Sequence, residues 1–195
     1  MQNKYQMLNE DIIVHDTSMD KYETLKTYFS KYLTNAEIES IEKYKNDIDR
    51  INHIISYTLP KIELAKLVNV RAEDIVIIRE ENKRPYFKDY DYYYSISHDS
   101  HYVAFVISKN NVGLDIEERQ FKDLKALSYV AYEDEIKECV NEDDKLSLWT
   151  FKEAYSKFSG LGIGKYLKDI KKDLIKEEVQ TIYINHLVIT LVKEK

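Results

Sequence analysis

The chain has 195 residues and a formal net charge of −6, and it is 44% hydrophobic and 33% charged. This composition is typical of one generous globular domain, or of two small halves that share a core. The negative charge excludes a broad nucleic-acid-binding surface, because such a surface needs a basic footprint to neutralise phosphates. A small basic pocket for a phosphorylated molecule is still compatible with it.

Cysteine usage and the lack of targeting signals indicate the cytoplasm. Cys139 is the single cysteine, so no internal disulfide can form, which fits a reducing compartment. The amino terminus has no apolar signal core, and no run reaches the roughly 18 apolar residues of a spanning helix. We therefore expect a soluble cytoplasmic protein without a membrane segment.

Helical periodicity dominates the first third of the chain. Three helices are expected there, over residues 20–33, 35–45 and 47–68. Thr34 or Asn35 is the expected N-cap of the second helix, with Glu37 close behind. Pro60 must kink or split the third helix, because proline lacks the amide donor that an interior position needs.

Runs rich in β-branched and aromatic residues predict strands in the middle and at the end of the chain. They cover residues 74–78, 92–97, 101–108, 112–117, 181–185 and 186–192. The runs 101–108 and 112–117 flank a short KNN turn, so we expect them to pair as a hairpin. Further helices are expected over 121–131, 133–140 and 142–159. This order predicts an α+β fold with mostly antiparallel pairing.

The stretch SLWTFKEAYSKFS (147–159) combines an apolar stripe with a polar face. The stripe consists of Leu148, Phe151, Tyr155 and Phe158, at the spacing of a buried helix face. The adjacent face carries Trp149, Lys152, Glu153 and Lys157. One explanation is a solvated surface with a Glu153–Lys157 ion pair worth about 0.2–0.5 kcal/mol. The other is a face that binds a ligand.

The stretch VGLDIEE (112–118) places two carboxylates on one side of a strand. Asp115 and Glu117 point the same way because side chains alternate along a strand, while Leu114 and Ile116 point the other way. Neighbouring carboxylates repel each other unless a cation or a donor lies between them. The pair is therefore either an exposed acidic edge or a set of oxygen ligands for Mg²⁺, which proteins hold with one or two carboxylates plus substrate phosphates.

Two further stretches offer groups that could meet an anion. In SISHDSH (95–101), Ser97 and His98 lie where a strand enters a turn, which could equally be a turn satisfied by its own contacts. In NKRP (82–85), Lys83 and Arg84 form either a solvated turn or a phosphate clamp.

Taken in order, SISH, GLDIE and WTFKEAYSK resemble the 4′-phosphopantetheinyl transferases of the surfactin-synthetase-activating (Sfp-like) type. The signatures of that family look like a strand of alternating hydrophobic residues with Gly, Asp and Glu, and a Trp-x-x-Lys-Glu-(Ser/Ala)-x-x-x-Lys helix. The core of the resemblance runs from about residue 84 to 164. It implies a phosphopantetheinyl transferase-like fold of two similar α+β halves in a pseudo-twofold arrangement. We expect residues 1–108 to form the first half and 109–195 the second, which carries the metal-binding strand and helix.

The activity that the resemblance implies is a Mg²⁺-dependent transfer of the 4′-phosphopantetheine arm of coenzyme A. The acceptor would be a serine of an acyl- or peptidyl-carrier protein, the second product 3′,5′-ADP, and the enzyme a monomer. Whether the pathway is fatty-acid, polyketide or nonribosomal peptide biosynthesis stays open. The alternative is a catalytically inactive relative that only binds coenzyme A or a carrier protein.

The resemblance also implies roles for individual residues. Asp115, Glu117 and Glu153 resemble the metal-binding carboxylates. Lys157, and with it Lys152, would face a phosphate of coenzyme A.

Three other positions resemble nucleotide-binding residues of the family, namely Ser97, His98 and Arg84. Arg50 is the first candidate for the 3′-phosphate contact, although another register would place Asn52 or His53 there.

A further carboxylate is expected near the metal. Glu135 matches it by position, with Glu133 as the alternative. Either Glu153 or Glu135 would remove the proton of the attacking serine.

Overall fold

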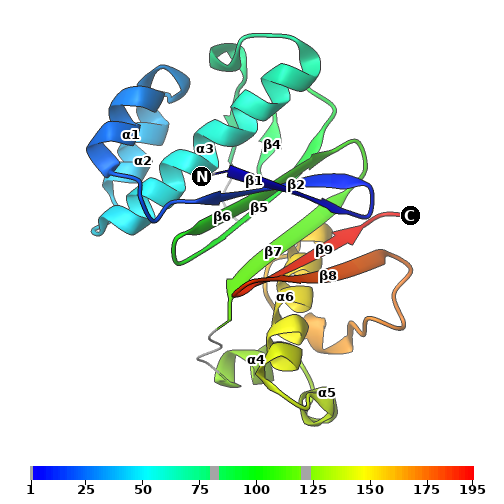
Figure 1. Ribbon diagram of the computed structural model, residues 1–195. Coiled ribbons are helices and arrows are strands. Elements are labelled where there is room, and N and C mark those ends of the chain that lie inside the picture. The colour runs from blue at the N-terminus through cyan, green and yellow to red at the C-terminus, as the bar shows by residue number, and fades with distance from the viewer. Residues whose placement is uncertain (1, 80–83, 120–123) are drawn as a thin grey trace.

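A computed structural model describes residues 2–79, 84–119 and 124–195 and arranges them in four layers (Figure 1). Helices of the first half cover one face of a four-stranded sheet. The other face of that sheet packs against a three-stranded sheet, whose far side is covered by a long helix of the second half. The predicted α+β class is confirmed.

The first sheet is antiparallel throughout and has the order β1-β2-β6-β5. Its strands are β1 (Gln2–Met7), β2 (Glu10–Asp16), β5 (Tyr93–Asp99) and β6 (Tyr102–Ser108). Neither β1 nor β2 is predicted from the sequence, because β1 is polar and mostly exposed and the buried apolar run of β2 is only three residues long. Their turn gives no glycine signal either, since Leu8 and Asn9 themselves adopt positive φ angles of 49° and 63°.

Three helices cover the face of this sheet that carries Ile13, Val103 and Phe105. They are α1 (Tyr22–Phe29), α2 (Asn35–Glu42) and α3 (Asp47–Val68), so all three predicted helices are confirmed. Thr34 is the N-cap of α2, because the amide of Glu37 donates to its hydroxyl at 3.2 Å.

Helix α3 continues through Pro60, so of the two predicted outcomes, a kink or a split, the split does not occur. The carbonyl of Ser56 would ordinarily accept the amide of residue 60. Here it accepts Arg79 Nη2 at 3.4 Å instead. The guanidinium of Arg79, which follows strand β3 (Ile77–Ile78), therefore partly replaces the amide donor that Pro60 lacks.

The second sheet has the order β7-β9-β8 and is also antiparallel. Its strands are β7 (Val112–Glu118), β8 (Glu178–Ile184) and β9 (Leu187–Lys193). The predicted hairpin of 101–108 with 112–117 is wrong, because β6 pairs with β2 and β5 whereas β7 pairs with β9. Residues 109–111 instead carry the chain from one sheet to the other, and the predicted boundary between the halves lies at the start of this connection.

The remaining elements follow the predictions with different lengths. A small ladder joins β3 (Ile77–Ile78) to β4 (Tyr86–Phe87), so the strand expected over 74–78 is shorter and later. The second half contains α4 (Leu124–Val130), α5 (Glu133–Glu138) and α6 (Glu142–Ser159). Residues 121–123 of the predicted helix 121–131 lie outside the described residues.

Side chains rather than a backbone ladder join β5 to β7. The Ser95 hydroxyl accepts the amide of Leu114 at 2.9 Å, and the Asp99 carboxylate accepts the amide of Glu118 at 2.8 Å. We call these contacts, together with the Ser97 contact described below, the β5–β7 seam. The seam aligns the two sheets where the halves meet.

None of the helices in the described ranges has both the length and the apolar character that crossing a bilayer would demand.

Candidate active site

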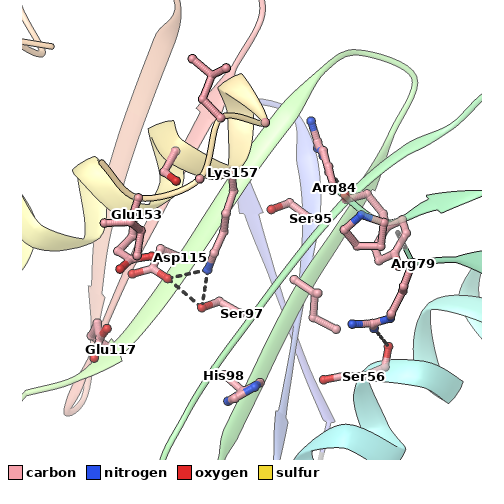
Figure 2. A pocket seen from close by; sticks show the side chains of 18 of the residues that line it. Ser56, Arg79, Arg84, Ser95, Ser97, His98, Asp115, Glu117, Glu153 and Lys157 are labelled. Carbon is pink, nitrogen blue, oxygen red and sulfur yellow. Dashed lines mark hydrogen bonds and ion pairs between the residues drawn. The ribbon is translucent and has the colours of Figure 1, made fainter. Parts of the chain in front are cut away.

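A cavity of about 840 Å³ lies between the two halves. Its wall comes from α3, β5 and Arg79 of the first half, and from β7, α6 and the loop after α6 of the second. Figure 2 shows carboxylates and Lys157 at one end of this cavity, with Arg79 and Arg84 at the other. The cavity therefore has an acidic end and a basic end.

The acidic end depends on a close approach of β7 to α6. A Cβ atom on Gly113 would lie only 2.1 Å from the carbonyl oxygen of Ala154, so a larger residue would force the two elements apart. This approach brings Asp115 and Glu117 of β7 to the same cavity as Glu153 of α6. Sequence alternation correctly predicted that Asp115 and Glu117 share a face.

Asp115 is the central residue of the acidic end and is only 2% exposed. Its Oδ1 accepts hydrogen bonds from Lys157 Nζ and from the Ser97 hydroxyl, both at 2.7 Å. Burial raises the pKa of Asp115, and Lys157 and Ser97 oppose that rise. Its Oδ2 is buried and has no hydrogen-bond partner. Such an orphaned carboxylate oxygen is expected to have a partner when the site is filled.

Glu117 and Glu153 border the same space and feel the charge of Asp115. Burial raises the pKa of Glu117 to about 8, and the Asp115 charge adds to the rise. Burial also raises the pKa of Glu153 to about 7, again with a contribution from Asp115, while Lys157 opposes it. Trp149 Nε1 donates to Glu117 Oε1 at 2.9 Å and holds it in place. Repulsion among these carboxylates favours a cation between them.

These residues fit a magnesium ion of the open kind. In the part of the chain that the structure describes, no three or more His, Cys, Asp or Glu side chains already enclose an ion position. Mg²⁺ does not require such a cage, because it keeps several waters and is held by one or two carboxylates plus substrate phosphates. The orphaned Oδ2 of Asp115, with two mutually repelling carboxyl groups beside it, supplies oxygen donors for that arrangement.

Arg84 lines the basic end but is largely occupied by the protein itself. Its Nη2 donates to the carbonyl of Tyr94 at 3.2 Å and to that of Val112, and its Nη1 donates to Asn111 Oδ1. Arg84 therefore ties β5 to the beginning of β7. Lys83, its predicted neighbour in a phosphate clamp, lies outside the described residues.

Arg79 is a cavity residue that sequence reasoning missed. Its guanidinium lies 4.2 Å from the centre of the Tyr57 ring and reaches the carbonyl of Ser56. No motif surrounds it in the sequence. The signal that could have found it is Pro60, which leaves the Ser56 carbonyl available for an outside donor.

Two imidazoles face the cavity between these ends. His53 stacks on Tyr44 with ring centres 4.0 Å apart and meets His98 edge-on at 5.5 Å. Burial lowers the pKa of His53 to about 4, with the charge of His98 contributing. Burial within the cavity wall, followed by the charge of Lys157, also lowers the pKa of His98. Both rings are therefore neutral at pH 7 and offer hydrogen bonds rather than positive charge.

The orphaned polar atoms of the described residues converge on this one cavity. They are Ser56 Oγ, Tyr94 OH and Asp115 Oδ2, and all three residues line its wall. Buried polar groups without partners are rare in folded proteins. Their convergence between an acidic and a basic end marks the cavity as a ligand-binding site.

Lys152 and Glu135 are not brought to the cavity. Lys152 is fully buried, and its Nζ bonds Glu135 Oε1 at 2.9 Å and the carbonyls of Leu167 and Ile170 at 2.9 and 2.5 Å. Successive helix residues turn by about 100°, so Lys152 lies on the flank of α6 that faces α5 rather than on the flank of Glu153. The predicted phosphate contact of Lys152, and the place of Glu135 near the metal, do not fit this arrangement.

Arg50 also lies away from the cavity. Its Nε donates to the carbonyl of Tyr44 at 2.8 Å, and its Nη1 pairs with Asp47 at 3.3 Å. Of the two alternative residues, Asn52 donates to the carbonyl of Ser100 at 2.9 Å and accepts the Thr17 hydroxyl at 3.2 Å. His53, in contrast, lines the cavity. The structure therefore does not support Arg50 as the residue that contacts the 3′-phosphate.

Comparison with known proteins assigns both halves to one family. The family model described as the 4′-phosphopantetheinyl transferase superfamily matches residues 111–192. The model described as the N-terminal part of 4′-phosphopantetheinyl transferase matches residues 21–110. The chain therefore belongs to the 4′-phosphopantetheinyl transferase family, whose members are transferases.

Three curated relatives carry the same description. The 4′-phosphopantetheinyl transferase gsp of Aneurinibacillus migulanus is 27% identical over 80% of this chain and 67% of its own length. A putative 4′-phosphopantetheinyl transferase of Haemophilus influenzae is 32% identical over 60% of this chain and 52% of its own. The 4′-phosphopantetheinyl transferase pptA of Paxillus involutus is 22% identical over 86% and 74%. These identities support membership of the family.

Proposed function

We propose that this chain transfers the 4′-phosphopantetheine arm of coenzyme A to a serine of an acyl- or peptidyl-carrier protein, with Mg²⁺, as an enzyme of the surfactin-synthetase-activating type. The observation that carries this proposal is the polarity of the cavity. Asp115, with its orphaned Oδ2, lines one end together with Glu117 and Glu153, and Arg79 lines the other end. Coenzyme A offers a pyrophosphate for a metal-binding end and a 3′-phosphate for a basic end.

The acidic end would hold the metal and the pyrophosphate. Asp115, Glu117 and Glu153 would supply oxygen ligands, and Mg²⁺ held there would stabilise the negative charge that grows on the leaving phosphate. An ammonium group has three donors, and Lys157 uses two of them on Ser97 and Asp115. Its third donor is available to a pyrophosphate oxygen.

The proton of the carrier serine needs an acceptor in the cavity. Glu153 lines the cavity, whereas Glu135 is paired with the buried Lys152. We therefore assign this role to Glu153, directly or through one water. The serine oxygen forms a bond to phosphorus, the bond from that phosphorus to 3′,5′-ADP breaks, and the serine proton passes to the carboxylate.

The basic end would hold the nucleotide. Arg79 can replace Arg50 as the partner of the 3′-phosphate, with the unpartnered hydroxyls of Ser56 and Tyr94 beside it. His98 borders the space between the two ends and can donate to a nucleotide phosphate.

Intact-protein mass spectrometry tests the proposal. Apo carrier proteins are incubated with this protein, coenzyme A and Mg²⁺, and a mass increase of one phosphopantetheine arm is expected. EDTA should abolish it, and Glu153→Ala should slow it by about 100-fold or more. Glu142→Ala removes an exposed carboxylate of the same helix and should leave the rate unchanged. No increase on several carrier proteins, with coenzyme A still bound, would identify a binding-only relative instead.

A further inference from the structure

Ser97 connects the two halves at the metal-binding end. It lies on β5 and is 8% exposed, and its hydroxyl donates to Asp115 Oδ1 on β7 at 2.7 Å. The same hydroxyl accepts Lys157 Nζ at 2.7 Å. A serine hydroxyl has a single proton, so the one that Ser97 donates to Asp115 cannot also be donated to a phosphate.

The two bonds to Oδ1 determine where the other oxygen of Asp115 points. The carboxylate is planar, so fixing Oδ1 from Ser97 and Lys157 also fixes Oδ2 (Figure 2). Oδ2 is buried and unpartnered, and Asp115 lines the cavity. Partners of this kind orient metal-binding carboxylates in many proteins, and removing one weakens metal affinity by about 10- to 100-fold.

We propose that Ser97 is a positioning residue for the metal site. It acts from the first half of the chain on Asp115 of the second half, and it keeps Oδ2 directed at the place of the cation. This inference rests on the proposed function, because it takes Asp115 as a metal ligand. It departs from the role that the resemblance implies for Ser97, which is a contact with the nucleotide phosphates.

The chain provides a matched control on the same strand. Ser95 lies two residues before Ser97, is buried as well, and also contacts β7. Its hydroxyl accepts the backbone amide of Leu114 and does not touch a carboxylate of the site. Loss of the Ser95 hydroxyl therefore reports the general effect of weakening the seam, without the specific effect on Asp115.

The test measures Mn²⁺ binding to the metal-free protein by electron paramagnetic resonance, without coenzyme A. Ser97→Ala is expected to raise the Mn²⁺ dissociation constant by about 10- to 100-fold. Ser97→Thr keeps the hydroxyl and should remain within about threefold of the wild type, as should Ser95→Ala. Ser97→Cys retains the volume with a poor donor, so it should repeat the loss even where Ser97→Ala folds badly.

A second measurement separates this proposal from its rival. Coenzyme A binding is followed by calorimetry in EDTA, where Ser97→Ala should match the wild type. Unchanged Mn²⁺ affinity with weakened coenzyme A binding in EDTA would overturn the positioning role and place Ser97 on a phosphate.

Asp115→Asn shows which part of the proposal has failed. If it binds Mn²⁺ as tightly as the wild type, the metal assignment in the proposed function is wrong, and the positioning role falls with it. If Asp115→Asn weakens binding and Ser97→Ala does not, only the positioning role is wrong.

Discussion

At the scale of single residues, the buried ion pair of Lys152 and Glu135 separates structural from functional charges. Lys152 lies one residue before Glu153, yet its ammonium is enclosed by α5 and by the segment that contains Leu167. A buried charge that loses its partner destabilises a protein strongly. The pair therefore fixes α5 on α6 without entering the cavity.

Lys152→Met should lower the free energy of unfolding by about 3 kcal/mol, because it leaves the Glu135 carboxylate without its buried partner. Urea denaturation followed by circular dichroism measures this loss. Lys137→Met removes an exposed lysine of α5 and should cost less than about 0.5 kcal/mol. Coenzyme A affinity of the folded Lys152→Met protein should not change, and a large loss of affinity would return Lys152 to the binding site.

His53 predicts a pH dependence of stability. Its pKa is about 4 in the folded protein and near 6.5 when unfolded, so the folded state binds fewer protons. The contribution of neutral His53 to the free energy of unfolding is fully present above pH 6.5 and is lost as the pH falls toward 4. His53→Gln should therefore reduce the loss of stability between pH 7.5 and 5 by about 1 kcal/mol, after allowance for partial solvation. The exposed His186 provides the control substitution, and an equal effect of both would contradict the assignment.

At the scale of elements, the contact between β7 and α6 builds the acidic end. At Gly113 the strand lies so close to the helix that the two nearest atoms an added Cβ would meet belong to the backbone of α6. Backbone cannot move aside as the end of a flexible side chain can. The distance between the strand carboxylates and Glu153 therefore depends on one missing methyl group.

Gly113→Ala should destabilise the protein by about 3 kcal/mol, since the methyl group must push β7 and α6 apart. Mn²⁺ affinity should fall in the part of the population that still folds, because the carboxylates separate. Thermal unfolding and Mn²⁺ titration give the two readings. Gly162→Ala tests a glycine whose Cβ would meet open space but whose φ is 72°, so it should cost only about 1 kcal/mol of backbone strain. Comparable losses at both positions would contradict the close-contact explanation.

The helices show what could be predicted from the sequence at this scale. The polar cap at Thr34 and the periodicity of 142–159 are local signals, and the structure confirms both. Strand pairing is not local, because β7 pairs with β9 at the far end of the chain, so the expected hairpin is wrong. Alternation nevertheless predicted the shared face of Asp115 and Glu117, since it depends only on neighbouring residues.

The residues of the candidate site also divide into those that local sequence motifs predict and those that they do not. Asp115, Glu117, Glu153 and Lys157 lie in two short motifs, and the structure brings them to one cavity. Arg79 lies in no such motif. Its position depends on the carbonyl of Ser56 in α3, which Pro60 leaves without an amide donor.

At the scale of the whole molecule, the cavity has one wall from each half of the chain. The two sheets also share a hydrophobic core, in which Ile12 and Val106 of the first sheet meet Leu114 and Ile189 of the second. A ligand in the cavity therefore contacts both halves at once. Its binding free energy adds to the stability of the whole fold rather than to that of one half.

Coenzyme A with Mg²⁺ should raise the melting temperature by about 5–10 °C at one hundred times the dissociation constant, since that concentration adds about 2.7 kcal/mol. Differential scanning calorimetry should show a single transition that moves as one, and EDTA should reduce the shift. Two transitions, of which only one responds to the ligand, would show that the halves unfold separately.

The β5–β7 seam has a consequence for how this protein tolerates change. A backbone ladder survives the loss of a side chain, because its bonds belong to the peptide groups. The seam consists of Ser95, Ser97 and Asp99, so a single base change in the gene can remove one of its bonds. Sequence drift should therefore be slow at these three positions of β5, although none of them belongs to the hydrophobic core.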